Sequence, residues 1–167
     1  MENKQKMLVR GALLLALAVV AQQLRLVLPL PTFVTSLVIG TIVNATLVLA
    51  ARYTGLFTAI VMCAALPVIA FLQGHLPLVL LIPIVFIGNF VLVVFCNKFW
   101  RMPVFIIAPI AKASVMYLSA LLLFKSLAIN TALAKVLLVA MGWPQFVTAI
   151  LGILLAKSLG QKIDSIK

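Results

Sequence analysis

The chain is a succession of apolar runs, each long enough to cross a lipid bilayer and each followed by a short polar break. A helix needs about 20 mainly apolar residues to span the hydrocarbon core. Hydrophobic residues make up 66% of the 167 residues and charged residues 9%, against about 45–50% and about 25% in an ordinary soluble domain. A water-soluble core of this size cannot hide that much apolar surface. The sequence therefore predicts a single all-α integral membrane domain over residues 1–167.

Breaks rich in proline, glycine and charge divide this domain into six expected transmembrane helices. The first five spans are predicted over Met7–Leu28, Thr32–Ala51, residues 56–72, Pro77–Cys96 and Pro103–Phe124.

The last third of the chain allows two interpretations. In one, residues from Lys125 onward form a single long, kinked sixth span. In the other, a short amphipathic helix lies on the outer surface, with Asn130-Thr131 as its N-cap, and the sixth span runs from Pro144 to about Leu159. We favour the second interpretation because proline suits the first turn of a helix. Both give six spans.

The distribution of positive residues favours a chain with both termini in the cytoplasm. In that orientation nine Lys and Arg lie inside, three lie outside, and Lys112 lies within the fifth span. The inner nine are Lys4, Lys6, Arg10, Arg52, Lys98, Arg101, Lys157, Lys162 and Lys167, and the outer three are Arg25, Lys125 and Lys135. Because these charges are scattered between apolar runs, the net charge of +11 indicates orientation in the cell membrane rather than nucleic-acid binding.

The composition excludes most membrane chemistry. The two acidic residues are Glu2 and Asp164, near the ends of the chain, and His75 is the only histidine. The sequence contains no GxxxxGK[ST], HExxH or GxSxG pattern, so a P-loop, a zinc protease site and a serine hydrolase elbow are not expected. Cys63 and Cys96 lie apart in apolar runs and are expected to be buried. We predict no catalytic residue, metal or cofactor, and no means of energising uptake.

Three polar residues are predicted near the bilayer midplane. Lys112 is nine residues past Pro103, about 14 Å from the inner edge. Asn44 and Asn89 each lie twelve residues past an expected span start, about 18 Å from the outer edge. A lysine at that depth costs at least about 2.5–3.5 kcal/mol and has no acid within the membrane to pair with. It is therefore uncharged, faces a wet cavity, donates to amide and carbonyl oxygens, or meets an anionic ligand.

Other polar residues extend this candidate substrate site. Met116 and Ser119 share the helix face of Lys112 by their i+4 and i+7 spacing. A second polar group is expected near the outer surface, where an entering solute would meet it first. Its members are Gln22, Arg25, Gln73, His75, Trp143 and Gln145. The alternative for these residues is an ordinary hydrated rim, with Trp143 in the interfacial aromatic belt. Asn44 and Asn89 have a structural alternative as hydrogen-bonding glue between helices.

The layout as a whole resembles the S components of energy-coupling factor (ECF) transporters, small six-helix membrane proteins that bind a vitamin or related micronutrient. The resemblance covers the length, the six spans, the inner termini, the scarcity of acids and the proline-started last span. It also includes the AxxxA motif Ala12-Leu13-Leu14-Leu15-Ala16 on the first span. Small residues four apart form a flat face that another helix can approach closely.

The resemblance implies a substrate-binding subunit that is energised by other proteins. Ala12 and Ala16 would contact a membrane coupling subunit, which works with two separate ATPase subunits. The substrate pocket would lie in the outer half, capped by the connections between spans 1 and 2 and between spans 3 and 4, and walled by spans 4 to 6. Transport would proceed by toppling of the whole S component. From charge alone, Lys112 favours an anionic or carbonyl-rich small molecule.

Three other functions remain open at this point. A stand-alone facilitator or channel would move its solute without partners. A structural membrane protein would bind no ligand and would tolerate the loss of Lys112. A membrane enzyme would have to rely on Lys112, His75 and Tyr117, which are not obviously convergent in the sequence.

Overall fold

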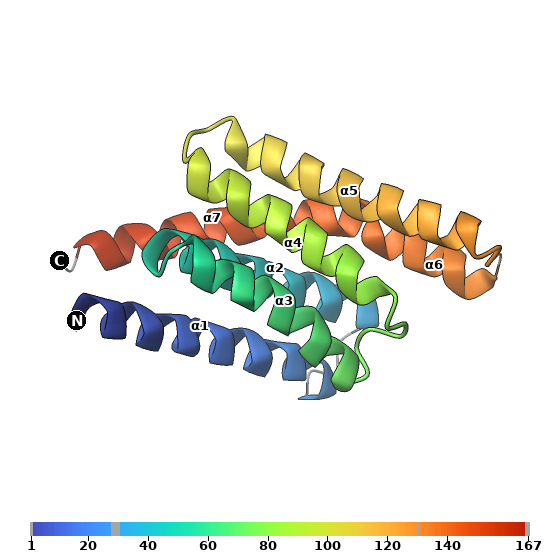
Figure 1. Cartoon of the computed structure of the whole chain (residues 1–167), viewed down its shortest axis with the longest axis horizontal. Coiled ribbons are helices and arrows are strands. Elements are labelled where there is room, and N and C mark those ends of the chain that lie inside the picture. The colour runs from blue at the N-terminus through green and yellow to red at the C-terminus, as the bar shows by residue number, and fades with distance from the viewer. Residues whose placement is uncertain (1, 28–30, 130, 166–167) are drawn as a thin grey trace.

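The computed structural model describes residues 2–27, 31–129 and 131–165, and these residues fold into helices joined by short turns (Figure 1). The helices are α1 (Glu2–Val27), α2 (Thr32–Tyr53), α3 (Leu56–Leu72), α4 (Leu81–Lys98), α5 (Val104–Ser126), α6 (Ala132–Met141) and α7 (Trp143–Ser165). The all-α prediction is confirmed for this part of the chain. Leu28, the expected end of the first span, lies outside the described residues.

The helices run along a common direction, with α2 in contact with α1, α3, α4 and α7. The start of α1 and the end of α7 lie at the same end of the bundle, together with the α2–α3 and α4–α5 turns (Figure 1). We call this the termini end. The end of α1, the α3–α4 turn and the α5–α6 turn lie at the other end, which we call the opposite end.

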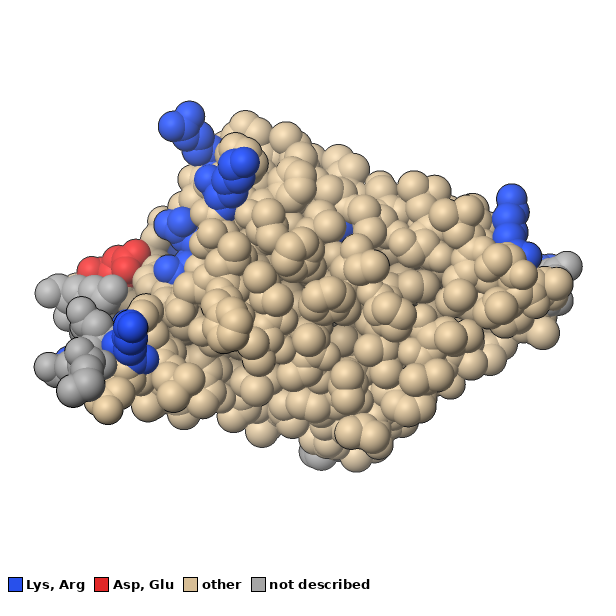
Figure 2. All heavy atoms as spheres, in the orientation of Figure 1, with Lys and Arg blue, Asp and Glu red and all other residues tan. Residues whose placement is uncertain are grey.

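The bundle is apolar on the outside and carries its polar residues within. Large hydrophobic side chains such as Leu26, Phe57 and Leu122 are 75%, 81% and 67% exposed, whereas Lys112 is 2% exposed. Figure 2 shows Lys and Arg gathered at the two ends of the molecule, with an almost uncharged surface between them. This polarity is the reverse of that of a soluble domain. It is compatible with a multi-pass membrane protein.

Five helical stretches are long and apolar enough to cross a membrane. They are α1, α2, α4, α5 and the run from Ala132 to Ser165 that contains α6 and α7. The third predicted span, α3, has 17 residues, about 26 Å of helix, which is slightly short of a typical core. The count of six spans and the inner placement of both termini therefore stay predictions.

Two details of the spans differ from the sequence expectations. Helix α4 begins at Leu81 rather than at Pro77, because residues 77–80 belong to the turn, in which the Leu81 amide donates to Leu78 O. At the other ambiguous segment, α6 and α7 are separate helices with the break at Gly142. They follow one another along the bundle (Figure 1), which agrees with the kinked alternative better than with a separate surface helix.

The start of α6 is capped as the sequence suggested. The Thr131 side chain accepts a hydrogen bond from the Ala134 amide at 3.2 Å, which satisfies one of the free donors at a helix N-terminus. Asn130, the other predicted cap residue, lies outside the described residues. Helix α6 then buries Ala134, Leu137 and Met141 in an apolar cluster with residues of α4 and α5.

Candidate functional site

The three predicted midplane residues meet in the middle of the bundle. The Lys112 Nζ of α5 donates to Asn44 Oδ1 of α2 at 2.5 Å and to Asn89 Oδ1 of α4 at 2.8 Å. All three side chains are buried, with 2%, 2% and 4% of their surfaces exposed for Lys112, Asn44 and Asn89. A lysine amine has only donors to offer as an ammonium, so the two amide oxygens are the complementary groups. Three helices are thus tied together without a carboxylate.

Local sequence places Lys112 where it can reach both asparagines. Gly88 of α4 faces α5, and a Cβ at this position would collide with the Met116 side chain and lie 3.6 Å from Lys112 Cγ. The missing Cβ therefore lets α5 approach α4 closely. Met116, predicted as a substrate contact, is fully buried in the apolar cluster formed with α4 and α6. In this arrangement Met116 packs between helices beside the Lys112 network.

The network continues into α7 through a residue that the sequence analysis missed. Asn44 Nδ2 donates to Thr148 Oγ1 at 3.2 Å, and Thr148 Oγ1 donates to Gln145 O at 3.3 Å. Thr148 is buried and lies one helical turn before Gly152, whose Cα packs against Asn44. Two small residues four apart, here a threonine and a glycine, are typical of a helix face that packs closely against another helix. This spacing is the feature of the sequence from which Thr148 could have been predicted.

The Lys112 network is closed in this structure. Lys112 is only 2% exposed, and it lines neither the hollow at the termini end nor the hollow on the α4–α5 surface. The network nevertheless retains hydrogen-bonding capacity, since an ammonium has three donors and the described residues supply two acceptors to Lys112 Nζ. One donor is left for a further oxygen. The ligand-binding role of Lys112 remains a prediction.

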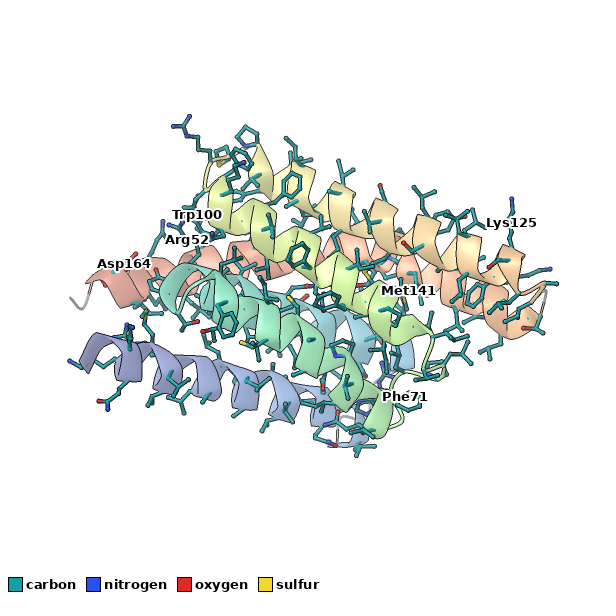
Figure 3. The ribbon with its side chains drawn as sticks, viewed as in Figure 1. Arg52, Phe71, Trp100, Lys125, Met141 and Asp164 are labelled. Atoms are coloured by element: carbon teal, nitrogen blue, oxygen red, sulfur yellow. The ribbon has the colours of Figure 1, made fainter. Side chains whose placement is uncertain are left out.

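A second polar cluster lies at the opposite end, where α1 meets the α3–α4 turn. It consists of Gln22 and Arg25 from the last turns of α1, and of Gln73 and His75 from that turn. Gln22 Nε2 donates to Leu66 O of α3 at 3.3 Å, and an Arg25 NH2 group donates to Ser36 Oγ of α2 at 2.7 Å. Phe71 marks this end of α3 in Figure 3. We call these four residues the opposite-end cluster.

Each member of the opposite-end cluster keeps a buried polar atom without a partner among the described residues. These atoms are Gln22 Oε1, Arg25 Nε, Gln73 Oε1 and His75 Nε2. Gln22 is only 6% exposed, so bulk water does not reach its side chain freely. Buried polar atoms without partners are rare in native proteins, and they call for a bound molecule or ordered water. The cluster therefore has hydrogen-bonding capacity to offer, and its binding role remains a prediction.

His75 gives the opposite-end cluster a pH-dependent stability. Burial lowers its pKa, and the nearby Arg25 guanidinium lowers it further. The folded protein therefore keeps His75 neutral at a pH at which the unfolded chain already binds a proton. We expect the free energy of unfolding to be highest above the ordinary histidine pKa of about 6.5 and to fall as the pH drops below it. Thermal melts of the purified protein between pH 7.5 and 5 measure this fall.

The matched variant is His75→Gln, which should flatten the melting temperature over the same pH range. The chain has one histidine and two acidic residues. Few groups other than His75 therefore titrate between pH 7.5 and 5, and the effect of His75 can be isolated. A fall of the same size in His75→Gln would show that another group is responsible.

The remaining predicted residues are dispersed. Trp143 is 53% exposed and its ring lies 5.4 Å from that of Phe33, in keeping with the aromatic-belt alternative. Gln145 Nε2 donates to Ala140 O at 3.2 Å across the α6–α7 break. Ser119 is half-buried on α5. Ala12 and Ala16 are exposed on α1.

Ser36, which was not predicted, belongs with Arg25. A lone serine inside an apolar span gives little signal in a sequence, so nothing singled it out.

Comparison with family models gave no match to this chain, and searches among curated proteins and solved structures gave no significantly similar protein.

Proposed function

We propose that this chain is the substrate-binding membrane subunit, or S component, of an ECF-type importer for a vitamin, a vitamin precursor or a related micronutrient. The termini end would face the cytoplasm and the opposite end the outside of the cell membrane. A coupling membrane subunit and two ATPase subunits would supply the energy. The chain itself would take part as binder and not as an enzyme.

The opposite-end cluster is the observation that carries this proposal. Four buried polar atoms that have no partner among the described residues lie on α1 and the α3–α4 turn, where a solute arriving from outside would first reach the bundle. Two of these atoms are amide oxygens that accept hydrogen bonds, and Arg25 Nε is a donor within the positively charged guanidinium. A small molecule with both donor groups and an anionic or carbonyl oxygen satisfies them together.

Lys112 would act deeper in the same bundle. Its remaining N–H can donate to a ligand oxygen without breaking the bonds to Asn44 and Asn89. In the alternative, the ligand oxygen replaces one asparagine oxygen at the same position. Both favour an anionic or carbonyl-rich group, and both predict that a purely cationic molecule is rejected.

The binding test uses the full chain, purified in mild detergent, and native mass spectrometry. We expect a co-purified small molecule of defined mass, or a mass gain with one member of a panel of vitamins and precursors. Gln22→Leu and Arg25→Met should each weaken binding of that molecule by about tenfold, the equivalent of one charge-assisted or buried hydrogen bond. Lys125→Gln, an exposed substitution on α5, serves as the control and should bind normally.

A structural role without a ligand is the second candidate, and the closed Lys112 network favours it. That role predicts a protein that carries no small molecule and gains no mass from any member of the panel. It also predicts that replacing Arg25 leaves unchanged the activity of any protein complex that this chain supports structurally. The binding measurement therefore separates the two candidates directly.

The coupling surface gives a prediction of its own. Because Ala12 and Ala16 are exposed on α1, a bulky residue there leaves the bundle intact but blocks close approach of another helix. We expect Ala12→Trp or Ala16→Trp to abolish uptake into cells, below about a tenth of wild type, with ligand binding by the purified subunit unchanged. Leu17→Trp, at a position that is also exposed on α1 but lies off the stripe of residues spaced by four, is the control and should retain uptake. Lost binding in folded Ala12→Trp protein would contradict the assignment of this face.

A further inference from the structure

A cavity of about 110 Å³ opens at the termini end, where the last turn of α2, the α4–α5 turn and the last turns of α7 meet. Its polar lining comprises Arg52, Tyr53, Trp100, Lys157 and Asp164, together with Gln161. Figure 3 labels Arg52, Trp100 and Asp164 close together at this end of the bundle. We call this the basic cavity. It lies at the end of the molecule remote from the opposite-end cluster and is independent of it.

The two cations of the basic cavity are positioned by aromatic rings. The Arg52 guanidinium carbon lies 4.8 Å from the centre of the Trp100 ring, and Lys157 Nζ lies 5.0 Å from the centre of the Phe105 ring. The two rings meet edge to face at 5.4 Å, so one aromatic pair fixes both cations. Contact with a ring face uses the charge of a cation but leaves its N–H donors available for oxygen atoms.

Among the residues that line the cavity, one carboxylate is present beside the two cations. The Asp164 carboxylate lines the same cavity and accepts a hydrogen bond from Tyr53 Oη at 3.0 Å. Two positive side chains and one negative side chain give the cavity a net charge of +1. A singly charged phosphodiester matches this charge better than a phosphate dianion, which the carboxylate would repel.

The position of the basic cavity also favours a lipid. A tryptophan beside basic residues at the end of an apolar bundle is typical of the level of the lipid headgroups. Next to Trp100 in the chain, Phe99 and Arg101 line a second hollow of about 260 Å³ with Phe95, Pro103, Val104 and Ile107. That hollow is almost wholly apolar and faces outward, as a groove for an acyl chain would.

We propose that the basic cavity binds the phosphodiester of a membrane phospholipid, with Arg52 and Lys157 as donors to its phosphate oxygens. The Arg52 guanidinium can donate two parallel hydrogen bonds, and the Lys157 ammonium supplies a further point charge. Asp164 disfavours a second negative charge on the bound group. A bound lipid would link α2, α7 and the α4–α5 turn at the surface of the membrane.

The test is native mass spectrometry of the full chain released from nanodiscs that contain equal amounts of phosphatidylglycerol, phosphatidylethanolamine and a neutral diacylglycerol. We expect retention of one phospholipid and no retention of the diacylglycerol. The double variant Arg52→Gln, Lys157→Gln should retain about tenfold less phospholipid, since two charge-assisted contacts are lost. Lys125→Gln, at the opposite end (Figure 3), is the matched loss of charge and should retain as much as wild type.

Two further measurements complete the test. One distinguishes a bound lipid from a soluble phosphate, and the other distinguishes a specific loss of lipid binding from misfolding. Inorganic phosphate at 10 mM should not displace the phospholipid, and displacement would overturn the lipid assignment. Arg52→Lys preserves the charge but not the paired donors, so its retention should fall between wild type and the double variant. Equal retention by the double variant and wild type, with unchanged melting temperatures, would overturn the proposal.

Discussion

Asn44→Leu is expected to lower the free energy of unfolding by about 2–3 kcal/mol, the largest effect of any single change in the Lys112 network. The substitution removes the acceptor at 2.5 Å from Lys112 Nζ and also the donor to Thr148. It leaves a buried amine with one described acceptor, Asn89. Removing one partner of a buried charged group costs more than removing the charge itself.

Lys112→Met should therefore change the free energy of unfolding much less, by no more than about 1 kcal/mol. This holds although a lysine is among the residues that cost most to insert into a bilayer. The side chain that remains fills similar space, and the two asparagines can reorient toward each other. In the Lys112→Met background the cost of Asn44→Leu should shrink by about 1–2 kcal/mol, because the interaction that it breaks is already absent. Reversible unfolding in mixed micelles with a denaturing detergent measures all four proteins of this cycle.

Ser114→Leu is the matched control on α5, since Ser114 is a polar residue on the exposed surface of the same helix. It should leave the free energy of unfolding nearly unchanged. If Asn44→Leu and Lys112→Met cost the same and show no coupling, the hydrogen bonds do not stabilise the bundle. Under the proposed function, folded Lys112→Met should also bind its ligand more weakly, which the structural role does not predict.

Much of the candidate site could be predicted from single residues whose type conflicts with their surroundings. Lys112, Asn44 and Asn89 stand out because a strong polar group inside an apolar span needs a partner. Estimated depths then placed them at one level, and the structure joins them directly. The depth of Asn89 was estimated from a helix start that lies at Leu81 rather than at Pro77. The prediction that Asn89 lies near Lys112 was still correct, because the helices pack side by side along a common direction.

Other parts could not be predicted, since they depend on how helices approach one another. Threonine is common in apolar helices and satisfies its hydroxyl within its own helix, so Thr148 gave no isolated signal. The packing of Met116 against Gly88 requires knowledge of which α4 face meets α5. The break at Gly142 was found in the sequence, but its two sides align along the bundle because α6 packs against α5.

Gly152→Ala is expected to lower the free energy of unfolding by about 2–3 kcal/mol. We expect this to be the largest loss caused by adding a single carbon atom. A Cβ at Gly152 would lie 2.5 Å from Asn44 Cβ, 3.0 Å from Ala45 N and 3.0 Å from Thr41 O. Two of these neighbours are backbone atoms of α2, which cannot rotate away as the tip of a side chain can. Relief therefore requires α7 to separate from α2, which would stretch the bond from Asn44 to Thr148.

The same substitution at Gly160 provides the control within α7. A Cβ there would lie 2.7 Å from Tyr53 Oη, the movable end of a side chain, and its other neighbours lie at 3.5 Å. Gly160→Ala should thus cost less than about 1 kcal/mol, because the tyrosine ring can shift. Unfolding of both variants in mixed micelles gives the comparison. Equal costs at the two positions would mean that α2 and α7 are not in backbone contact at Gly152, and that the Lys112 network does not rest on this close approach.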